Sequence, residues 1–140
     1  MKGVIIGIIS LTLFCGNSCT TEKQDDSGFF VEDADYIQIV LFHLAQRCES
    51  CTAVERETQW LLEEEYREEV LDGRIKFVPL NFQNDNGKTA ARLLRASGQT
   101  LFVVKGDHIS DLTSAAFMYA NTHPENYQEA LRKALNNYLK

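Results

Sequence analysis

The sequence predicts an α/β domain with a central mixed sheet of about four strands, helices on both faces and the element order β-α-β-α-β-β-α. Apolar runs rich in β-branched and aromatic residues alternate with segments whose apolar residues recur every three or four positions. A long helical segment joins the first two runs, and such a crossover predicts a parallel pair of strands. A Gly-Asp turn joins the last two runs and predicts an antiparallel hairpin at the sheet edge.

Each element follows from a local pattern. The first strand is apolar over nearly its whole length, which is typical of a strand buried on both faces. The first helix follows Cys51 and has its stop signal at Gly73, while Pro124 lies in the first turn of the last helix. The predicted strands are residues 36–43, 75–81, 100–105 and 108–111, and the predicted helices are residues 52–72, 88–96 and 124–140.

Two local expectations accompany these elements. In the short second helix, Leu93 and Leu94 are expected to face the core. Between the fourth strand and the last helix, residues 112–121 are expected to form a connection. Its apolar residues 117–119 are expected to cover the end of the sheet, with a docking surface as the alternative. No internal repeat or second domain boundary interrupts this pattern.

Length and charge exclude several classes of protein. The 140 residues suit one domain, and 14 basic against 20 acidic residues give a net charge of −6. An acidic chain without a basic run lacks the positive surface that nucleic acid requires, so we expect no nucleic-acid partner. Beyond the first 15 positions no apolar stretch reaches about 18 residues, which excludes a multipass membrane protein.

The N-terminus has the pattern of a lipoprotein leader. A positive start at Lys2 precedes an apolar run over residues 4–14, the length of a signal-peptide core. Small residues precede Cys19, whereas the bulky Phe14 precedes Cys15, so Cys19 is the predicted lipidation site. A plain secretory signal that discards both cysteines is the alternative.

This leader divides the chain and predicts its location. We expect a signal peptide over residues 1–18, an acylated Cys19 with a polar tether over residues 19–28, and the folded domain over residues 29–140. The lipid would hold the domain at the membrane in the cell envelope, in the periplasm or at the outer-membrane surface. In that location the domain would lie outside the cytoplasm, where disulfides persist.

The motif Cys48-Glu49-Ser50-Cys51 lies between the first strand and the first long helix. The unpaired N–H groups and positive dipole end of a helix N-terminus stabilise a thiolate, which is the attacking species in disulfide exchange. Cys48 is therefore the predicted exposed nucleophile. Cys51, one turn along, is the more buried resolving thiol, and the two form a dithiol–disulfide couple.

Three neighbours are expected to tune this couple. Arg47 places a positive charge beside Cys48 and should lower its pKa, whereas the negative charge of Glu49 should raise it. Because the two effects oppose each other, the redox direction does not follow from the sequence. His43, at the end of the first strand, could accept or give the thiol proton, or could be a structural side chain.

From residue 36 to the C-terminus, the strand–CxxC–helix opening and the following elements resemble the thioredoxin family. The resemblance implies a three-layer thioredoxin-like fold and thiol–disulfide chemistry. More narrowly, residues 42–51 and 112–120 are similar to a set of small thioredoxin-like lipoproteins, the nitrophenyl-compound nitroreductase subunit family.

Several positions depart from the thioredoxin pattern. Arg47 replaces the usual tryptophan, Glu49-Ser50 replaces Gly-Pro, and Phe42 stands where a buried acid often relays the proton of the resolving thiol. The loop that faces the motif reads Gly98-Gln99-Thr100, with Gln99 where a cis-proline is usual, and we expect a trans bond there. That loop normally binds peptide, so a dedicated redox partner protein or a small disulfide or thiol is the expected substrate.

The leading interpretation is a membrane-tethered thiol–disulfide oxidoreductase without a cofactor. The alternative is a non-catalytic lipoprotein subunit or binding module, whose vicinal dithiol at Cys48 and Cys51 holds a metal, a metalloid or a redox partner. Structural zinc needs four ligands, and no second close pair of cysteines exists in the domain, so no metal site is expected. A merely stapling disulfide is a poorer explanation, because so short a loop removes little chain entropy.

Overall fold

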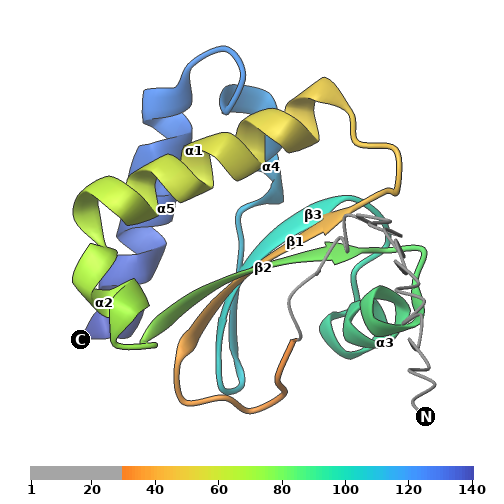
Figure 1. Cartoon of the computed structure of the whole chain (residues 1–140), viewed down its shortest axis with the longest axis horizontal. Coiled ribbons are helices and arrows are strands. Elements are labelled where there is room, and N and C mark those ends of the chain that lie inside the picture. The colour runs from red at the N-terminus through yellow and green to blue at the C-terminus, as the bar shows by residue number, and fades with distance from the viewer. Residues whose placement is uncertain (1–29) are drawn as a thin grey trace, which may run out of the picture.

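The computed structural model describes residues 30–140. The predicted signal peptide, Cys19 and the tether lie outside the described residues. Within them, the elements follow the order β1-α1-α2-β2-α3-β3-β4-α4-α5 (Figure 1). No helix in this part of the chain is both long and apolar enough to cross a bilayer.

A four-stranded mixed sheet forms the centre of the domain, in the spatial order β2-β1-β3-β4. As expected, β1 and β2 are parallel across the helical crossover, whereas β3 and β4 form an antiparallel hairpin. β3 also pairs antiparallel with β1, which makes β1 a central strand. The strands are β1 (Ile37–His43), β2 (Ile75–Asn81), β3 (Thr100–Lys105) and β4 (His108–Asp111).

Helices cover both faces of the sheet, which confirms the predicted α/β arrangement (Figure 1). One apolar cluster lies between the sheet and α1, α4 and α5, and a second lies between the sheet and α3. Alternate residues of β1 enter the two clusters, because successive side chains of a strand point to opposite faces. The helices are α1 (Glu49–Glu65), α2 (Arg67–Leu71), α3 (Asp85–Leu94), α4 (Thr113–Tyr119) and α5 (Pro124–Leu139).

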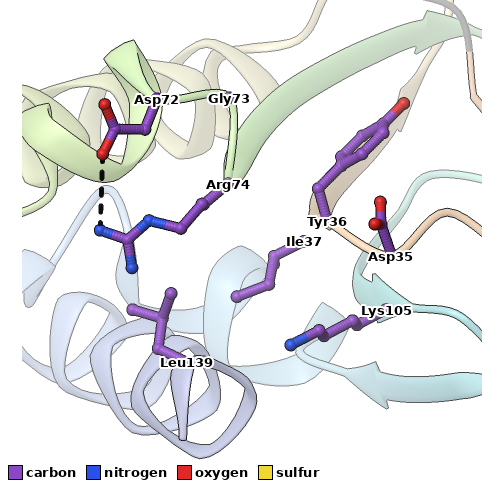
Figure 2. A pocket seen from close by; sticks show the side chains of 8 residues that line it. All are labelled: Asp35, Tyr36, Ile37, Asp72, Gly73, Arg74, Lys105 and Leu139. Atoms are coloured by element: carbon purple, nitrogen blue, oxygen red, sulfur yellow. Dashed lines mark ion pairs between the residues drawn. The ribbon is translucent and has the colours of Figure 1, made fainter.

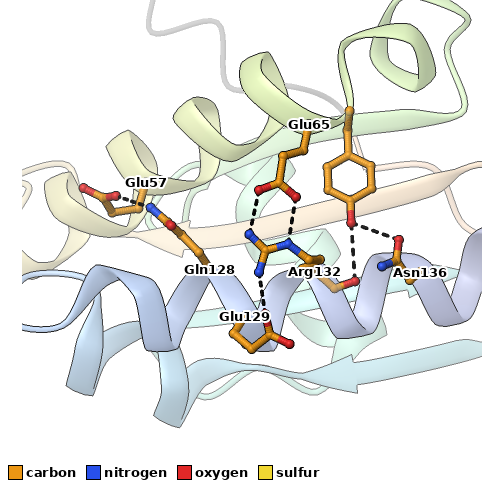
Figure 3. Close-up of polar contacts among 7 residues, drawn as sticks. Glu57, Glu65, Gln128, Glu129, Arg132 and Asn136 are labelled. Atoms are coloured by element: carbon orange, nitrogen blue, oxygen red, sulfur yellow. Dashed lines mark hydrogen bonds and ion pairs between the residues drawn. The ribbon is translucent and has the colours of Figure 1, made fainter.

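A polar seam fixes α5 along α1 (Figure 3). The Arg132 guanidinium donates two hydrogen bonds to the Glu65 carboxylate, at 2.7 and 2.6 Å. The hydroxyl of Tyr66 donates to Oδ1 of Asn136 at 3.0 Å. These contacts lie beside the apolar cluster and hold α1, whose first turn carries the CxxC motif, in place against the domain.

The long predicted helix is interrupted at Tyr66. The prediction of one helix up to Gly73 was wrong, since α1 ends at Glu65 and the short α2 follows. Tyr66 has φ −125° and ψ 22°, outside the helical region, and its side chain is buried and bonded to α5. A tertiary contact thus overrides a helical spacing that continued to Val70.

Two further local predictions need correction. Residues 113–119, expected as a connection, form helix α4, whose Ala116 is fully buried in the cluster beneath α1. Of the two leucines expected to face the core, Leu94 is buried but Leu93 is 46% exposed. Helix α3 begins at Asp85 rather than at residue 88, because the Asn84 side chain caps it by accepting from the Gly87 N–H at 2.7 Å.

Candidate functional site

The two cysteines of the CxxC motif meet at the start of α1. Cys48 is the N-cap residue, with extended backbone at φ −83° and ψ 164°, and its thiol is exposed. Its Sγ accepts a hydrogen bond from the Cys51 backbone N–H at 3.5 Å. Cys51 lies in the first helical turn and is completely buried. The difference in exposure is the one expected, and both cysteines are free thiols here.

The surroundings of the two sulfurs shift their pKa values in opposite directions. The pKa of Cys48 is lowered from its ordinary value of 9.0, mainly by the Cys51 N–H and thiol, with a smaller contribution from the Gln99 amide. Burial raises the pKa of Cys51 to about 11, and the neighbouring Cys48 sulfur adds to this increase. At neutral pH the pair therefore favours a thiolate on the exposed sulfur.

Gln99 brings a side-chain amide to both sulfurs from the loop before β3. Its Nε2 donates to Cys51 Sγ at 2.9 Å and lies 3.6 Å from Cys48 Sγ. The peptide bond before it is trans, since the described residues contain no cis bond. The resemblance to thioredoxins placed this loop opposite the motif, but the hydrogen bonds from Gln99 to the sulfurs were not predicted. The signal that could have indicated them is the polar side chain at this facing position.

The two neighbours of Gln99 in the facing loop make no hydrogen bond to the sulfurs. Gly98, at φ +156°, has open space where a side chain would stand. Thr100 begins β3 opposite Phe42, and its buried hydroxyl lacks a hydrogen-bond partner within residues 30–140. In this loop the contact with the dithiol thus comes from Gln99.

His43 is fully buried and holds Arg47 rather than a thiol. Its Nδ1 lies 2.9 Å from the Leu44 carbonyl oxygen, which can only accept, so this nitrogen carries the proton. Its Nε2 lies 3.2 Å from a guanidinium nitrogen of Arg47, which can only donate. The ring is therefore a neutral imidazole with both nitrogens engaged. Of the two roles considered for His43, this arrangement favours the structural side chain, because both ring nitrogens bind groups other than the thiols.

Arg47 and Glu49, the two charges expected to tune Cys48, both have partners. Arg47 forms an ion pair with Glu55, which lies in the second turn of α1 and which the sequence pattern did not indicate. The charge of Arg47 lowers the pKa of Cys51, whereas the largest causes of the lowered pKa of Cys48 are hydrogen bonds. The Glu49 carboxylate accepts from Nδ2 of Asn121 at 3.1 Å and so joins the start of α1 to the α4–α5 connection.

A metal would find two sulfur ligands at this site. Within residues 30–140, no group of three or more histidine, cysteine, aspartate and glutamate side chains is placed to hold an ion. The arrangement can instead support attack by an exposed thiolate, followed by attack of a buried thiol one turn away.

The opposite end of β1 carries a cavity of about 300 Å³ (Figure 2). Its basic side chains already bind carboxylates or the backbone. Arg74 lies 3.4 Å from Glu69 and 3.9 Å from Asp72, and Lys105 donates to the Tyr138 carbonyl at 2.7 Å. This cavity is concave but has little unused chemistry, so the dithiol is the candidate site.

Comparison with known proteins adds little to this geometry. No protein-family model and no curated protein matches the chain. A solved structure described as "Structure of a malarial protein" covers 75% of this chain and 99% of its own, with 16% identity and a TM-score of 0.48. A likeness of that size carries no argument about function, so the functional case rests on the dithiol and its neighbours.

Proposed function

We propose that the chain is a thioredoxin-like thiol–disulfide oxidoreductase, tethered in the cell envelope by a lipid on Cys19. One observation carries the proposal: an exposed thiol of lowered pKa caps helix α1, and a buried thiol of raised pKa lies one turn behind it. A pair built only to staple a strand to a helix has no need of this asymmetry. The mixed sheet with helices on both faces supports a thioredoxin-like arrangement around the motif.

The reaction needs only the two sulfurs and a disulfide. The Cys48 thiolate attacks one sulfur of the substrate disulfide, the substrate S–S bond breaks, and the leaving thiolate takes up a proton. Cys51 then attacks the Cys48 sulfur of the mixed disulfide and releases the second substrate thiol. Two electrons pass from the protein dithiol to the substrate, and the reverse sequence oxidises a substrate dithiol.

The facing loop favours a narrow range of substrates. The Gln99 side chain lies against both sulfurs, at 2.9 and 3.6 Å, and occupies space beside the attacking thiol. A substrate must approach the exposed side of Cys48 past this amide. A small disulfide, or a dedicated partner that presents a single accessible disulfide, fits this restriction better than a broad set of proteins.

Turnover and trapping test the proposal. The full-length chain in detergent should catalyse reduction of a small aromatic disulfide by a dithiol reductant, and Cys48→Ser should abolish this turnover. Cys51→Ser should arrest the reaction as a mixed disulfide on Cys48, detected as a mass increase that the reductant removes. The matched control is Ser50→Ala, which alters the motif but no sulfur and should retain turnover.

One result would replace this function with the alternative. If the wild-type chain shows no turnover but binds trivalent arsenic through both thiols, the domain is a binding module with a vicinal dithiol. A mixed disulfide that forms equally well on Cys51 in the Cys48→Ser chain would contradict the assignment of the two roles.

A further inference from the structure

The resolving step poses a chemical problem at Cys51. This thiol is fully buried and must become a thiolate to attack the mixed disulfide. Phe42, wholly buried in the apolar cluster beneath α3, offers no proton acceptor, and both ring nitrogens of His43 are engaged elsewhere. Within residues 30–140, no carboxylate forms a hydrogen bond with the Cys51 sulfur.

Besides Cys48, the Gln99 side chain forms a hydrogen bond with this sulfur. Its Nε2 donates to Cys51 Sγ at 2.9 Å, against 3.6 Å to Cys48 Sγ. An N–H donor strengthens its bond when the acceptor becomes an anion, so the contact favours the thiolate over the thiol. The amide does not titrate and cannot take the proton itself. It can only lower the free energy of the charged sulfur.

We propose that Gln99 is a catalytic residue of the resolving step, in which its side-chain amide stabilises the Cys51 thiolate that attacks the mixed disulfide. The inference rests on the proposed function and assigns the group that activates its second half. Cys51 gives its proton to a solvent base at exposed Cys48, its thiolate forms the bond to Cys48 Sγ, and the bond between Cys48 and the substrate sulfur breaks. The departing thiolate takes up a proton through the solvent that reaches exposed Cys48.

Formation of the mixed disulfide prepares Cys51 for this role. In the dithiol, the Cys48 sulfur raises the pKa of Cys51 through its charge and its hydrogen bond. Once Cys48 is covalently bound to substrate it has neither a negative charge nor the same accepting power, so both contributions disappear. Burial then opposes ionisation, while the backbone hydrogen bond from Cys48 and the charge of Arg47 favour it. The 2.9 Å hydrogen bond from Gln99 acts in the same direction. The amide, shared between two sulfurs in the dithiol, becomes available to Cys51 alone.

Single-turnover kinetics separate the two halves. In a full-length Cys15→Ser, Cys19→Ser background, Cys48 and Cys51 are the only thiols of the chain. One equivalent of dithiobis(nitrobenzoate) should release one coloured thiolate on attack by Cys48 and a second on attack by Cys51. Gln99→Leu should slow the second release about tenfold, a barrier increase of about 1.4 kcal/mol, and move its pH midpoint upward. The first release should change by less than about threefold, because the 3.6 Å contact is the weaker one.

Two variants distinguish donation from a structural effect. Gln99→Glu keeps the length of the side chain but replaces the donor by a negative charge, so it should slow the second release more than Gln99→Leu does. Gln59→Leu makes the same chemical change at an exposed position of α1 and should leave both releases unchanged.

The possible failures are distinguishable. A second release that is equally fast in wild-type and Gln99→Leu chains overturns the role of Gln99 and leaves the couple intact. Equal slowing of both releases, without a change in the pH midpoint of the second, identifies Gln99 as a structural residue and also overturns the inference. A wild-type chain that releases only one equivalent does not form the couple, which overturns the proposed function itself.

Discussion

The two ends of strand β1 present polar groups in opposite arrangements. Around its first residue, at the cavity of Figure 2, Arg74 is neutralised by Asp72 and, outside the lining, by Glu69. Beyond its last residue, hydrogen-bond donors converge on two sulfurs, from the Cys51 N–H and the Gln99 amide. The first end is hollow and chemically satisfied, and the second end has reactive groups that its neighbours leave available.

Shape and chemistry therefore point to different places in this molecule. A cavity lies at the charged end, where Lys105 binds a backbone carbonyl and Lys76 lies 4.2 Å from the Tyr36 ring. At the dithiol end, hydrogen-bond donors point at the two sulfurs, which can titrate, and this arrangement identifies the candidate site. We therefore expect substitutions beside the sulfurs to change their alkylation rates strongly. Substitutions at the charged end should hardly change these rates.

The largest expected effect is the difference in reactivity between the sulfurs themselves. With the pKa of Cys48 below 9.0 and that of Cys51 at about 11, the gap exceeds two units, or about 100-fold in thiolate population at neutral pH. The weaker nucleophilicity of a thiolate of low pKa reduces this advantage to about tenfold, and burial of Cys51 increases it again. Brief alkylation of the reduced chain followed by peptide mass spectrometry should therefore label Cys48 first.

The labelling of the two cysteines should rise over different pH ranges. Labelling of Cys48 should rise through a midpoint below 9.0, whereas labelling of Cys51 should continue to rise toward pH 11. Unfolding the chain in denaturant should remove the difference, because the helix N-terminus and the burial are lost together. Equal labelling of the folded chain at neutral pH would contradict the asymmetry on which the proposed function depends.

The sequence predicts the sheet well, because strand patterns and turn residues are local. The second, third and fourth strands have the predicted limits, and the first begins one residue later, at Ile37. What it missed depends on contacts across the domain. Tyr66 leaves the helix to bond with Asn136, 70 positions away, and α4 is stabilised by packing of Ala116 into the main cluster. Neither contact leaves a mark on the local pattern.

The site divides in the same way. The CxxC motif and its place at a helix start are local, so Cys48 and Cys51 could be assigned from the sequence. The partners of the tuning residues are not local: Gln99 is 48 positions from Cys51, and Asn121 is 72 from Glu49. Even Glu55, only eight residues from Arg47, was missed, because its pairing depends on the path of the loop before α1.

A smaller effect should come from Arg47, and it should fall on Cys51. Arg47→Gln removes a charge that favours the Cys51 thiolate, so the pKa of Cys51 should rise. In a Cys48→Ser background, which isolates the buried thiol, alkylation of Cys51 at a fixed alkaline pH should slow about two- to fivefold, since partial exposure and pairing weaken the charge. The effect should shrink as salt is added.

Glu55→Gln provides the opposite change at the same place. It removes the negative charge of Glu55 beside Arg47, so alkylation of Cys51 should accelerate where Arg47→Gln slows it. Two shifts of the same sign would show that the variants act by loosening the loop before α1 rather than through charge. A change confined to Cys48 would restore the expectation that Arg47 tunes the nucleophile.

The smallest effect should come from the charged end. Lys105→Met removes the ammonium group that donates to the Tyr138 carbonyl and keeps most of the side-chain length, so the free energy of unfolding should fall by about 1 kcal/mol.

Lys105 and Thr100 are the two ends of β3, and five residue steps of about 3.3 Å put them roughly 17 Å apart. That distance is about twice the Debye length of about 8 Å at physiological ionic strength. Alkylation rates of both cysteines should therefore match those of the wild type in physiological salt, and any difference should emerge only near 0.01 M salt, where the Debye length is about 30 Å. If Lys105→Met changed the labelling of Cys51 in physiological salt as much as Arg47→Gln does, the two ends of β1 would form one electrostatic site and the comparison between them would fail.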